Sequence, residues 1–184
     1  MRRWRPSTAV SPASLPTADS SPDVWRAPLI SRVTERLYVG ALPRPEQAAT
    51  LAALRVRLII SLSLQRPPSV YYRGPFHVVR LTWPDSPLLP LPLSLLARGV
   101  RAAQPEVAAG RPVLVHCRAG VHRSVAVAAC ILIAEGRSAD EAMRLIKEAR
   151  PVADPYAWYV QPRIRRFAAY WQRQENVIGP PGAP

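Results

Sequence analysis

Short apolar runs separated by longer amphipathic stretches occupy the middle of the chain. Runs rich in β-branched residues predict buried strands, and they cover residues 36–39, 56–64, 76–81 and 113–116. Helical spacing of apolar residues predicts helices, and these cover residues 46–54, 93–109, 123 onward, 139–150 and 155–172. Strands that alternate with helices in this way form an α/β sheet with helices packed on it.

Prolines and capping residues set the expected limits of the helices. Pro105 is expected to disturb the helix over 93–109 and to end it early, because proline lacks an N–H and clashes with the preceding turn. Ser138 and Glu141 form a capping box that opens the next-to-last helix. Asp154 and Pro155 are predicted as the cap and the first residue of the last helix.

The two ends of the chain differ in composition from this middle region. Residues 1–28 are rich in proline, serine and alanine without apolar periodicity, which predicts a disordered arm. Residues 174–184 are predicted to form a flexible tail, so one domain is expected over residues 29–173. The whole chain of 184 residues is long enough for one domain with a sizeable core.

Positive charge dominates the sequence. The formal net charge is +13, and arginine carries almost all of it because Lys147 is the only lysine. Such a charge attracts phosphoproteins, anionic lipid headgroups or nucleic acid, although a GC-rich genome also produces this arginine usage. The sequence has no RNA-binding motif and no interleaving of aromatic and basic residues, so nucleic acid is an unlikely partner.

Signal segments, apolar spans and cysteines indicate the cellular compartment of the protein. No apolar segment follows Arg2 and Arg3, so no secretory signal is expected, although the N-terminus weakly resembles an organellar transit peptide. No apolar span reaches the roughly 18 residues of a transmembrane helix. Two cysteines do not form a disulfide framework. A cytoplasmic location is expected, with Cys130 as a small filler of the core.

The segment VLVHCRAGVHRS, residues 113–124, carries the clearest chemical signal. A buried strand leads into it and an apolar helix follows, so the residues between form a tight loop at a helix N-terminus. Backbone N–H groups and the positive end of the helix converge there on an anion. Gly120 permits the turn, Arg123 supplies a planar fork for two phosphoryl oxygens, and the site favours Cys117 as a thiolate.

The pattern His116-Cys117-x-x-Gly120-x-x-Arg123-Ser124 resembles the active-site loop of the cysteine-dependent protein tyrosine phosphatases. Residues 35–63 and 137–155 are similar to parts of the dual-specificity subfamily of these enzymes, in its small, atypical, single-domain form. The resemblance implies a dual-specificity phosphatase catalytic domain over residues 29–173. It also implies a central mixed sheet flanked by helices, with no metal and no cofactor.

This chemistry needs an acid for the leaving oxygen, and the sequence offers one candidate. Asp85 is the only carboxylate between Glu46 and Glu106, and it lies between two prolines after a predicted strand. By the resemblance Asp85 is the general acid. Alternatively, it caps a helix that begins near Leu88.

The resemblance also implies roles for the rest of the loop. Ser124 donates to the cysteine sulfur and eases its departure; an ordinary first-turn cap is the alternative, and the two roles are compatible. His116 hydrogen-bonds the loop backbone, which a satisfied core histidine would also do. His122 adds charge at the rim or faces solvent, and Arg118 faces outward or contacts an acidic substrate. The residues expected to bind the phosphate are Arg118, Ala119, Gly120, Val121, His122 and Arg123.

Together these residues predict a phosphomonoester hydrolase that acts on phosphotyrosine and on phosphoserine or phosphothreonine in proteins, through a cysteinyl-phosphate intermediate. Three alternatives stay open. The same chemistry could act on a phosphoinositide, another phospholipid or an RNA 5′-phosphate. The chain could instead be a non-catalytic phosphate-binding module. A Cys-x5-Arg loop also occurs on other folds, such as a rhodanese-like sulfurtransferase or an arsenate reductase.

Overall fold

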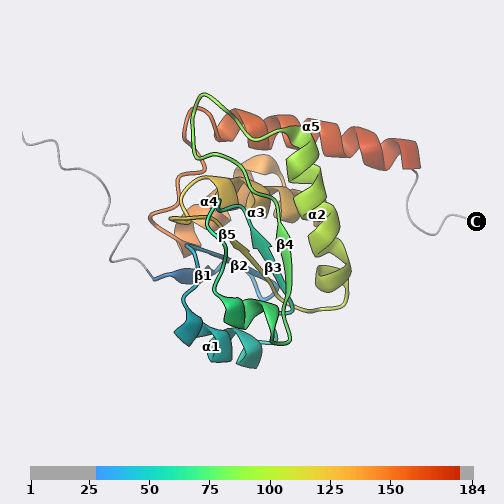
Figure 1. The fold of residues 1–184 in the computed structure, drawn as a ribbon. Helices are drawn as coiled ribbons and strands as arrows, with labels where there is room; N and C mark the ends of the chain where they lie inside the picture. Colours follow the sequence, from blue (N-terminus) through green and yellow to red (C-terminus); the bar gives the residue numbers. More distant parts are fainter. Residues whose placement is uncertain (1–27, 179–184) are drawn as a thin grey trace, which may run out of the picture.

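A computed structural model describes residues 28–178 and shows a five-stranded mixed sheet between two layers of helices (Figure 1). The strands are β1 (Ile30–Arg32), β2 (Leu37–Gly40), β3 (Leu58–Ser61), β4 (His77–Arg80) and β5 (Val113–His116). Their order is β1-β2-β5-β3-β4, in which β1 is antiparallel to β2 and the other pairs are parallel. The carboxyl ends of β2 to β5 therefore meet at one edge of the sheet, where open α/β sheets bind ligands.

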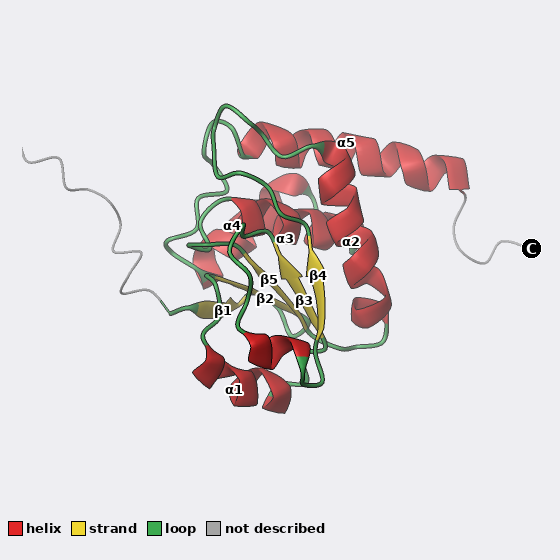
Figure 2. Ribbon diagram, in the orientation of Figure 1, coloured by secondary structure: helices red, strands yellow, loops and turns green. Residues whose placement is uncertain are grey.

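The helices cover both faces of this sheet (Figure 2). They are η1 (Pro45–Gln47), α1 (Ala48–Ala53), η2 (Ser69–Tyr72), α2 (Leu93–Ala108), α3 (Arg123–Ala134), α4 (Ala139–Ala149) and α5 (Gln161–Ile178). Side chains alternate between the faces along each strand. In β2, Leu37 and Val39 pack in the large core with α2 to α5, while Tyr38 packs with α1 on the other face. The expected mixed sheet flanked by helices is thus confirmed.

Helix α3 is the centre of the larger core. All residues from Arg123 to Ile133 are buried, including Cys130, because the helix lies between the sheet and the helices α2, α4 and α5. A helix that is apolar all round belongs in such an interior. This burial fixes the position of α3, which follows the loop that begins at Cys117.

The last helix begins later than the sequence predicts. Residues 155–160 form turns, and α5 starts at Gln161 rather than at Pro155. The Asp154 side chain accepts from the Tyr156 N–H, which stabilises a turn in place of a helical cap. Pro162 then lies in the first turn of α5, where its missing N–H has no intrahelical partner to lose.

Other expected boundaries also change. The helix predicted over 46–54 is a 3₁₀ turn followed by the short α1. Pro105 does not end its helix early, because α2 continues to Ala108. The short edge strand β1 was not predicted, since three residues carry too little alternation.

The predicted ends of the chain are only partly visible. The arm expected over residues 1–28 lies outside the described residues except for Pro28. The tail expected over 174–184 begins as helix, because α5 extends to Ile178, and residues 179–184 are outside the described part. Among residues 28–178, no helix is both long and apolar enough to cross a bilayer.

Candidate active site

Residues 117–122, here called the Cys117 loop, connect β5 to α3 at the carboxyl edge of the sheet. Four successive carbonyls of this loop accept hydrogen bonds from groups outside it. Those of Arg118 and Val121 accept from the backbone N–H groups of Leu42 (3.2 Å) and Asp154 (2.9 Å). Those of Ala119 and Gly120 accept from one side chain, that of Arg150 (3.0 and 2.8 Å).

The outward carbonyls determine where the amides point. In a trans peptide, the N–H of the next residue points away from the carbonyl. The N–H groups of residues 119–122 therefore face the interior of the loop. One of them, the Gly120 N–H, donates to the Cys117 sulfur over 3.2 Å. A ring of inward N–H groups next to the N-terminus of α3 is an anion-binding site.

Gly120 is required by the backbone path. Its φ is +72°, a conformation that residues with a Cβ rarely adopt. A Cβ at this position would also lie 2.5 Å from the Gly40 carbonyl carbon and 2.7 Å from the Ala41 nitrogen. The loop therefore packs directly on the end of β2.

Arg150 is the residue that sequence reasoning missed. It follows α4, far from Cys117 in sequence, yet its side chain is 1% exposed and lies behind the Cys117 loop. Besides the two loop carbonyls, it donates to the Pro28 carbonyl and to the Ser31 hydroxyl. Burial lowers the pKa of Arg150, and the nearby Cys117 opposes that effect. In the sequence Arg150 stands between Ala149 and Pro151 at the end of a predicted helix, where arginine is common, so no local signal marked this role.

Cys117 and Ser124 are in contact at the base of the loop. The Cys117 sulfur lies 3.3 Å from the Ser124 hydroxyl, and both residues are buried. Ser124 does not cap α3, because the N-cap residue is His122 and no side chain caps that end. The alternative of an ordinary capping serine is therefore wrong for this residue.

Asp85 approaches the loop from the connection between β4 and α2, residues 81–92, here called the Asp85 loop. Its carboxylate accepts from Arg123 Nη2 over 2.8 Å, while Arg123 Nη1 donates to the carbonyls of Leu62 (3.1 Å) and Trp83 (2.7 Å). No helix begins near Leu88, so the alternative of Asp85 as a helix cap is wrong. Arg123 thus joins the Cys117 loop to the Asp85 loop.

Part of Arg123 is still unpaired. The Arg123 side chain is 6% exposed, compared with 43% for Asp85. Within residues 28–178 its buried Nε has no hydrogen-bond partner. Buried polar groups are nearly always satisfied, so this donor is suited to an anion bound in the loop.

His116 is fully buried below the loop, with Nδ1 3.2 Å from the Cys117 carbonyl. Its pKa is lowered to about 4, chiefly by burial and in addition by the charges of Arg80 and Arg123, while that hydrogen bond acts in the opposite direction. The ring is neutral at pH 7 and donates to the backbone. It therefore holds the loop and does not serve as a base.

The remaining predicted residues, His122 and Arg118, lie at the outer edge of the Cys117 loop. His122 is half-buried and packs against Tyr159, with ring centroids 5.2 Å apart. Burial lowers the pKa of His122, against the attraction of Asp85 and Asp154, so it adds little positive charge at pH 7. Arg118 is exposed, as its outward-facing alternative predicts.

Comparison with known proteins assigns this site to a family. The family model described as "Dual specificity phosphatase, catalytic domain" matches residues 37–161, which include the whole Cys117 loop, Asp85 and Arg150. The chain belongs to the dual specificity phosphatase family. It is therefore a cysteine-dependent phosphatase, a hydrolase that acts on phosphorylated substrates.

Individual dual specificity phosphatases resemble the chain over most of its length. It is 31% identical to human dual specificity phosphatase 28 over 159 residues, which cover 85% of this chain and 87% of that protein. The crystal structure of human DUSP28 superposes with a TM-score of 0.70 at 28% identity, covering 79% of this chain and 96% of that one. The tyrosine-protein phosphatase vhp-1 of Caenorhabditis elegans is 29% identical over 133 residues, but the match covers only 19% of that protein and 68% of this chain.

Proposed function

We propose that the chain hydrolyses phosphotyrosine and phosphoserine or phosphothreonine in proteins through a cysteinyl-phosphate intermediate. The observation that carries this proposal is the Cys117 loop, in which inward N–H groups surround a thiol in contact with a serine hydroxyl. The sulfur suits nucleophilic attack on a bound phosphomonoester, and the N–H groups suit the binding of its oxygens.

In the first step, the Cys117 thiolate attacks phosphorus while the bond from phosphorus to the leaving oxygen breaks. The loop N–H groups and Arg123 hold the three other phosphoryl oxygens. Asp85 gives its proton to the leaving oxygen, so the products are a neutral alcohol or phenol, the cysteinyl phosphate and the Asp85 carboxylate.

In the second step, a water molecule attacks the phosphocysteine. Asp85 takes a proton from this water as the new bond from oxygen to phosphorus forms. The bond from phosphorus to sulfur breaks, and the Ser124 hydroxyl donates to the departing thiolate at the contact seen here, 3.3 Å. Inorganic phosphate leaves, and the thiolate is restored.

The ion pair between Arg123 and Asp85 supports a role for both residues. The Arg123 fork is bound to the Asp85 carboxylate over 2.8 Å. A phosphate dianion competes with Asp85 for this fork. Substrate binding thereby releases the acid next to the leaving oxygen.

The test is hydrolysis of p-nitrophenyl phosphate in EDTA. We expect turnover by the wild-type protein, complete loss in Cys117→Ser, and a decrease of roughly 10² to 10⁴-fold in Asp85→Asn. Cys130→Ala and Asp140→Asn are matched controls, because Cys130 lies in the core and Asp140 pairs with Arg165 at the surface. Turnover that survives Cys117→Ser would overturn the mechanism. Intact phosphopeptide binding without turnover would favour the binding module.

A phosphoinositide or another phospholipid is the second candidate substrate. Large exposed apolar side chains next to the site, Leu88 (83% exposed) and Trp158 (72%), favour it. A panel of phosphotyrosine and phosphothreonine peptides against phosphoinositides, compared by kcat/KM, separates the candidates. An RNA 5′-phosphate, the third alternative, belongs in the same panel.

A further inference from the structure

Two loops next to the candidate active site expose large apolar side chains. Among the described residues, Leu88 and Trp158 have the highest exposed fractions of all large apolar side chains, 83% and 72%, and Leu89 is 51% exposed. Leu88 and Leu89 belong to the Asp85 loop, and Trp158 belongs to the turns before α5. These three residues are here called the apolar rim. Exposed apolar groups that gather in one place mark interaction sites.

The two loops meet at the site. Leu89 and Tyr159 line the same small cavity with Asp85, His122 and Arg123. Tyr159 in turn contacts the ring of Trp158, with centroids 5.5 Å apart. Figure 1 shows the Asp85 loop, in green, beside the orange loop that precedes α5. The apolar rim therefore lies on two loops that meet beside Asp85 and Arg123.

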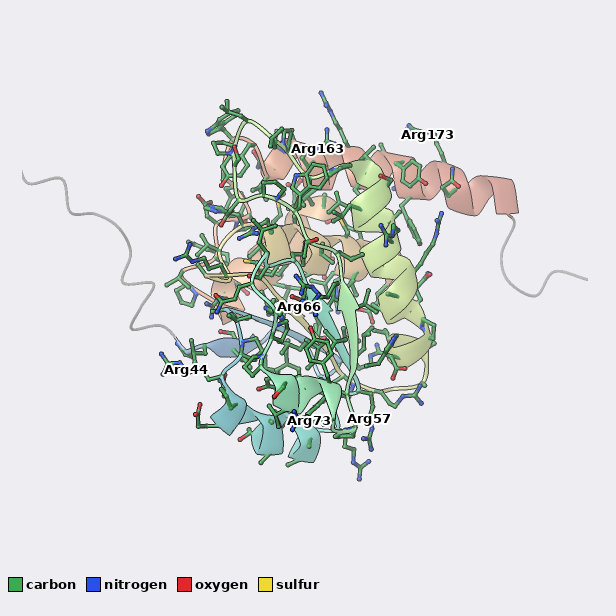
Figure 3. The ribbon with its side chains drawn as sticks, in the orientation of Figure 1. Arg44, Arg57, Arg66, Arg73, Arg163 and Arg173 are labelled. Carbon is green, nitrogen blue, oxygen red and sulfur yellow. The ribbon has the colours of Figure 1, made fainter. Side chains whose placement is uncertain are left out.

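Arginines accompany the rim. Arg118 is exposed on the Cys117 loop, and Arg163 lines the cavity shared by Leu89 and Tyr159. Figure 3 shows Arg163 at the start of α5, next to the Asp85 loop. Arg166 is exposed one turn later on α5, and its spacing of three residues from Arg163 places the two side chains on neighbouring positions of the helix surface.

The shape of the rim selects among possible partners. A peptide groove encloses apolar side chains between walls, whereas Leu88 and Trp158 protrude from loop tips. Protruding leucine and tryptophan side chains that are flanked by arginines match the boundary between anionic headgroups and acyl chains. The net charge of +13 adds long-range attraction to such a surface.

We infer that the apolar rim, together with Arg118, Arg163 and Arg166, docks the phosphatase on an anionic membrane surface. Leu88, Leu89 and Trp158 enter the acyl boundary, while the arginines lie at headgroup level. The Cys117 loop then faces the membrane. This docking goes beyond the proposed function, since it holds whether the hydrolysed phosphate belongs to a protein or to a lipid.

The test is flotation of the full chain with phosphatidylcholine vesicles that either lack or contain phosphatidylserine or a phosphatidylinositol monophosphate. We expect binding to both kinds of anionic vesicle and weaker binding at high salt. The variant Leu88→Ser/Trp158→Ser should bind roughly tenfold or more weakly, because it removes two large apolar groups from the boundary. Its hydrolysis of p-nitrophenyl phosphate should be unchanged, since neither side chain belongs to the reacting groups.

Tyr72→Ser is the matched control. Tyr72 is 47% exposed but lies on η2, which packs with α1 on the other face of the sheet. Vesicle binding by this variant should equal that of the wild type. A second readout is quenching of tryptophan fluorescence by brominated lipids, which should decrease in Trp158→Phe.

Three outcomes would overturn the inference. The first is that the wild type does not bind anionic vesicles at low salt, and the second is that the double variant binds as well as the wild type. The third is that no protein binds vesicles while the double variant loses turnover of phosphopeptides, which would identify the apolar rim as a protein-binding surface. Because Cys117→Ser should bind vesicles without turnover, loss of docking and loss of the proposed chemistry are distinguishable.

Discussion

Arg150 donates hydrogen bonds to the carbonyls of Ala119 and Gly120 from a side chain that is almost fully buried. All the partners of this guanidinium are neutral: three carbonyls and the Ser31 hydroxyl. A buried cation with neutral partners is costly, so its position needs a compensating benefit. That benefit is the fixed orientation of two peptide planes in the Cys117 loop.

Arg150→Met should therefore impair both stability and turnover. Leaving the buried carbonyls of Ala119 and Gly120 without donors should cost about 2 to 5 kcal/mol of the free energy of unfolding. kcat should fall as the loop N–H groups lose their orientation. Urea denaturation and p-nitrophenyl phosphate kinetics measure the two effects. Arg144→Met, on the exposed side of α4, is the control, and equal turnover by both variants would contradict the role of Arg150.

His116 gives the fold a pH dependence. Its pKa is about 4 in the folded protein, against an ordinary value of 6.5. As the pH falls, the unfolded chain takes up the proton first. His116 therefore leaves the free energy of unfolding unchanged above pH 6.5, and it lowers this free energy progressively between pH 6.5 and pH 4. The loss is on the order of 3 kcal/mol. Urea unfolding at several pH values should show a smaller acid loss in His116→Gln, and identical pH profiles would contradict this account.

At the scale of elements, the site is a junction of three segments. The Cys117 loop packs on the end of β2 through Gly120, on the turns after α4 through the Val121 carbonyl, and on the Asp85 loop through Arg123. Helix α3 anchors the loop because it is buried along its length. Each contact holds one part of the loop, so a small shift in any neighbour displaces the N–H groups.

Gly120→Ala tests this close approach. Its Cβ would meet the Gly40–Ala41 peptide at 2.5 to 2.7 Å, so the loop must move. A displacement of this kind should reduce kcat/KM roughly hundredfold. Gly110→Ala is a matched control, since Gly110 has a φ of +70° but no atom within 4 Å of the added Cβ. Backbone strain alone would affect both variants equally, and equal losses of turnover would argue against the contact.

At the scale of the whole molecule, α5 completes the core although it lies beyond the part matched by the family model, which ends at residue 161. Ile164, Phe167 and Trp171 are buried against the rest of the larger core. The rings of Phe167 and Trp171 stack with centroids 5.4 Å apart. The minimal catalytic unit therefore includes this helix, and residues 28–178 are proposed as that unit.

Truncation tests this extent. A chain ending at Val160 loses three large buried side chains, each worth about 2 to 5 kcal/mol, which together approach the whole stability of a typical domain. It should show no cooperative thermal unfolding. A chain of residues 28–178 should keep the Tm and the turnover of the full protein. Cooperative unfolding of the chain that ends at Val160 would show that α5 is dispensable.

Among the described residues, the arginines lie at both ends of the molecule rather than at one place. Figure 3 shows Arg163 and Arg173 on α5, and Arg57 and Arg73 at the opposite end of the molecule. Several others form exposed ion pairs along or between helices, such as Arg144 with Glu148 and Arg165 with Asp140. Such pairs add little stability. The net charge therefore affects which partners the protein attracts more than it affects stability. The cytoplasmic location stays a prediction.

The sequence alone determined four of the five strands, most helices and the Cys117 loop, because these depend on local patterns. Apolar periodicity placed β5 at its observed bounds, and the buried run after Arg123 fixed α3. Neighbouring Cys117, Gly120, Arg123 and Ser124 are joined by a single turn, so their chemistry could be read from their spacing. Asp85 could be singled out because it is the only carboxylate in a long stretch.

Only the tertiary structure decided how distant residues support that loop. The contact of Arg150 with Ala119 and Gly120, the pairing of Arg123 with Asp85 and the rim formed by Leu88, Leu89 and Trp158 each join segments far apart in sequence. The bond from the Asp154 N–H to the Val121 carbonyl likewise joins segments far apart in sequence. Local patterns carry no information about such contacts, because they form only when packing of the core brings the segments together.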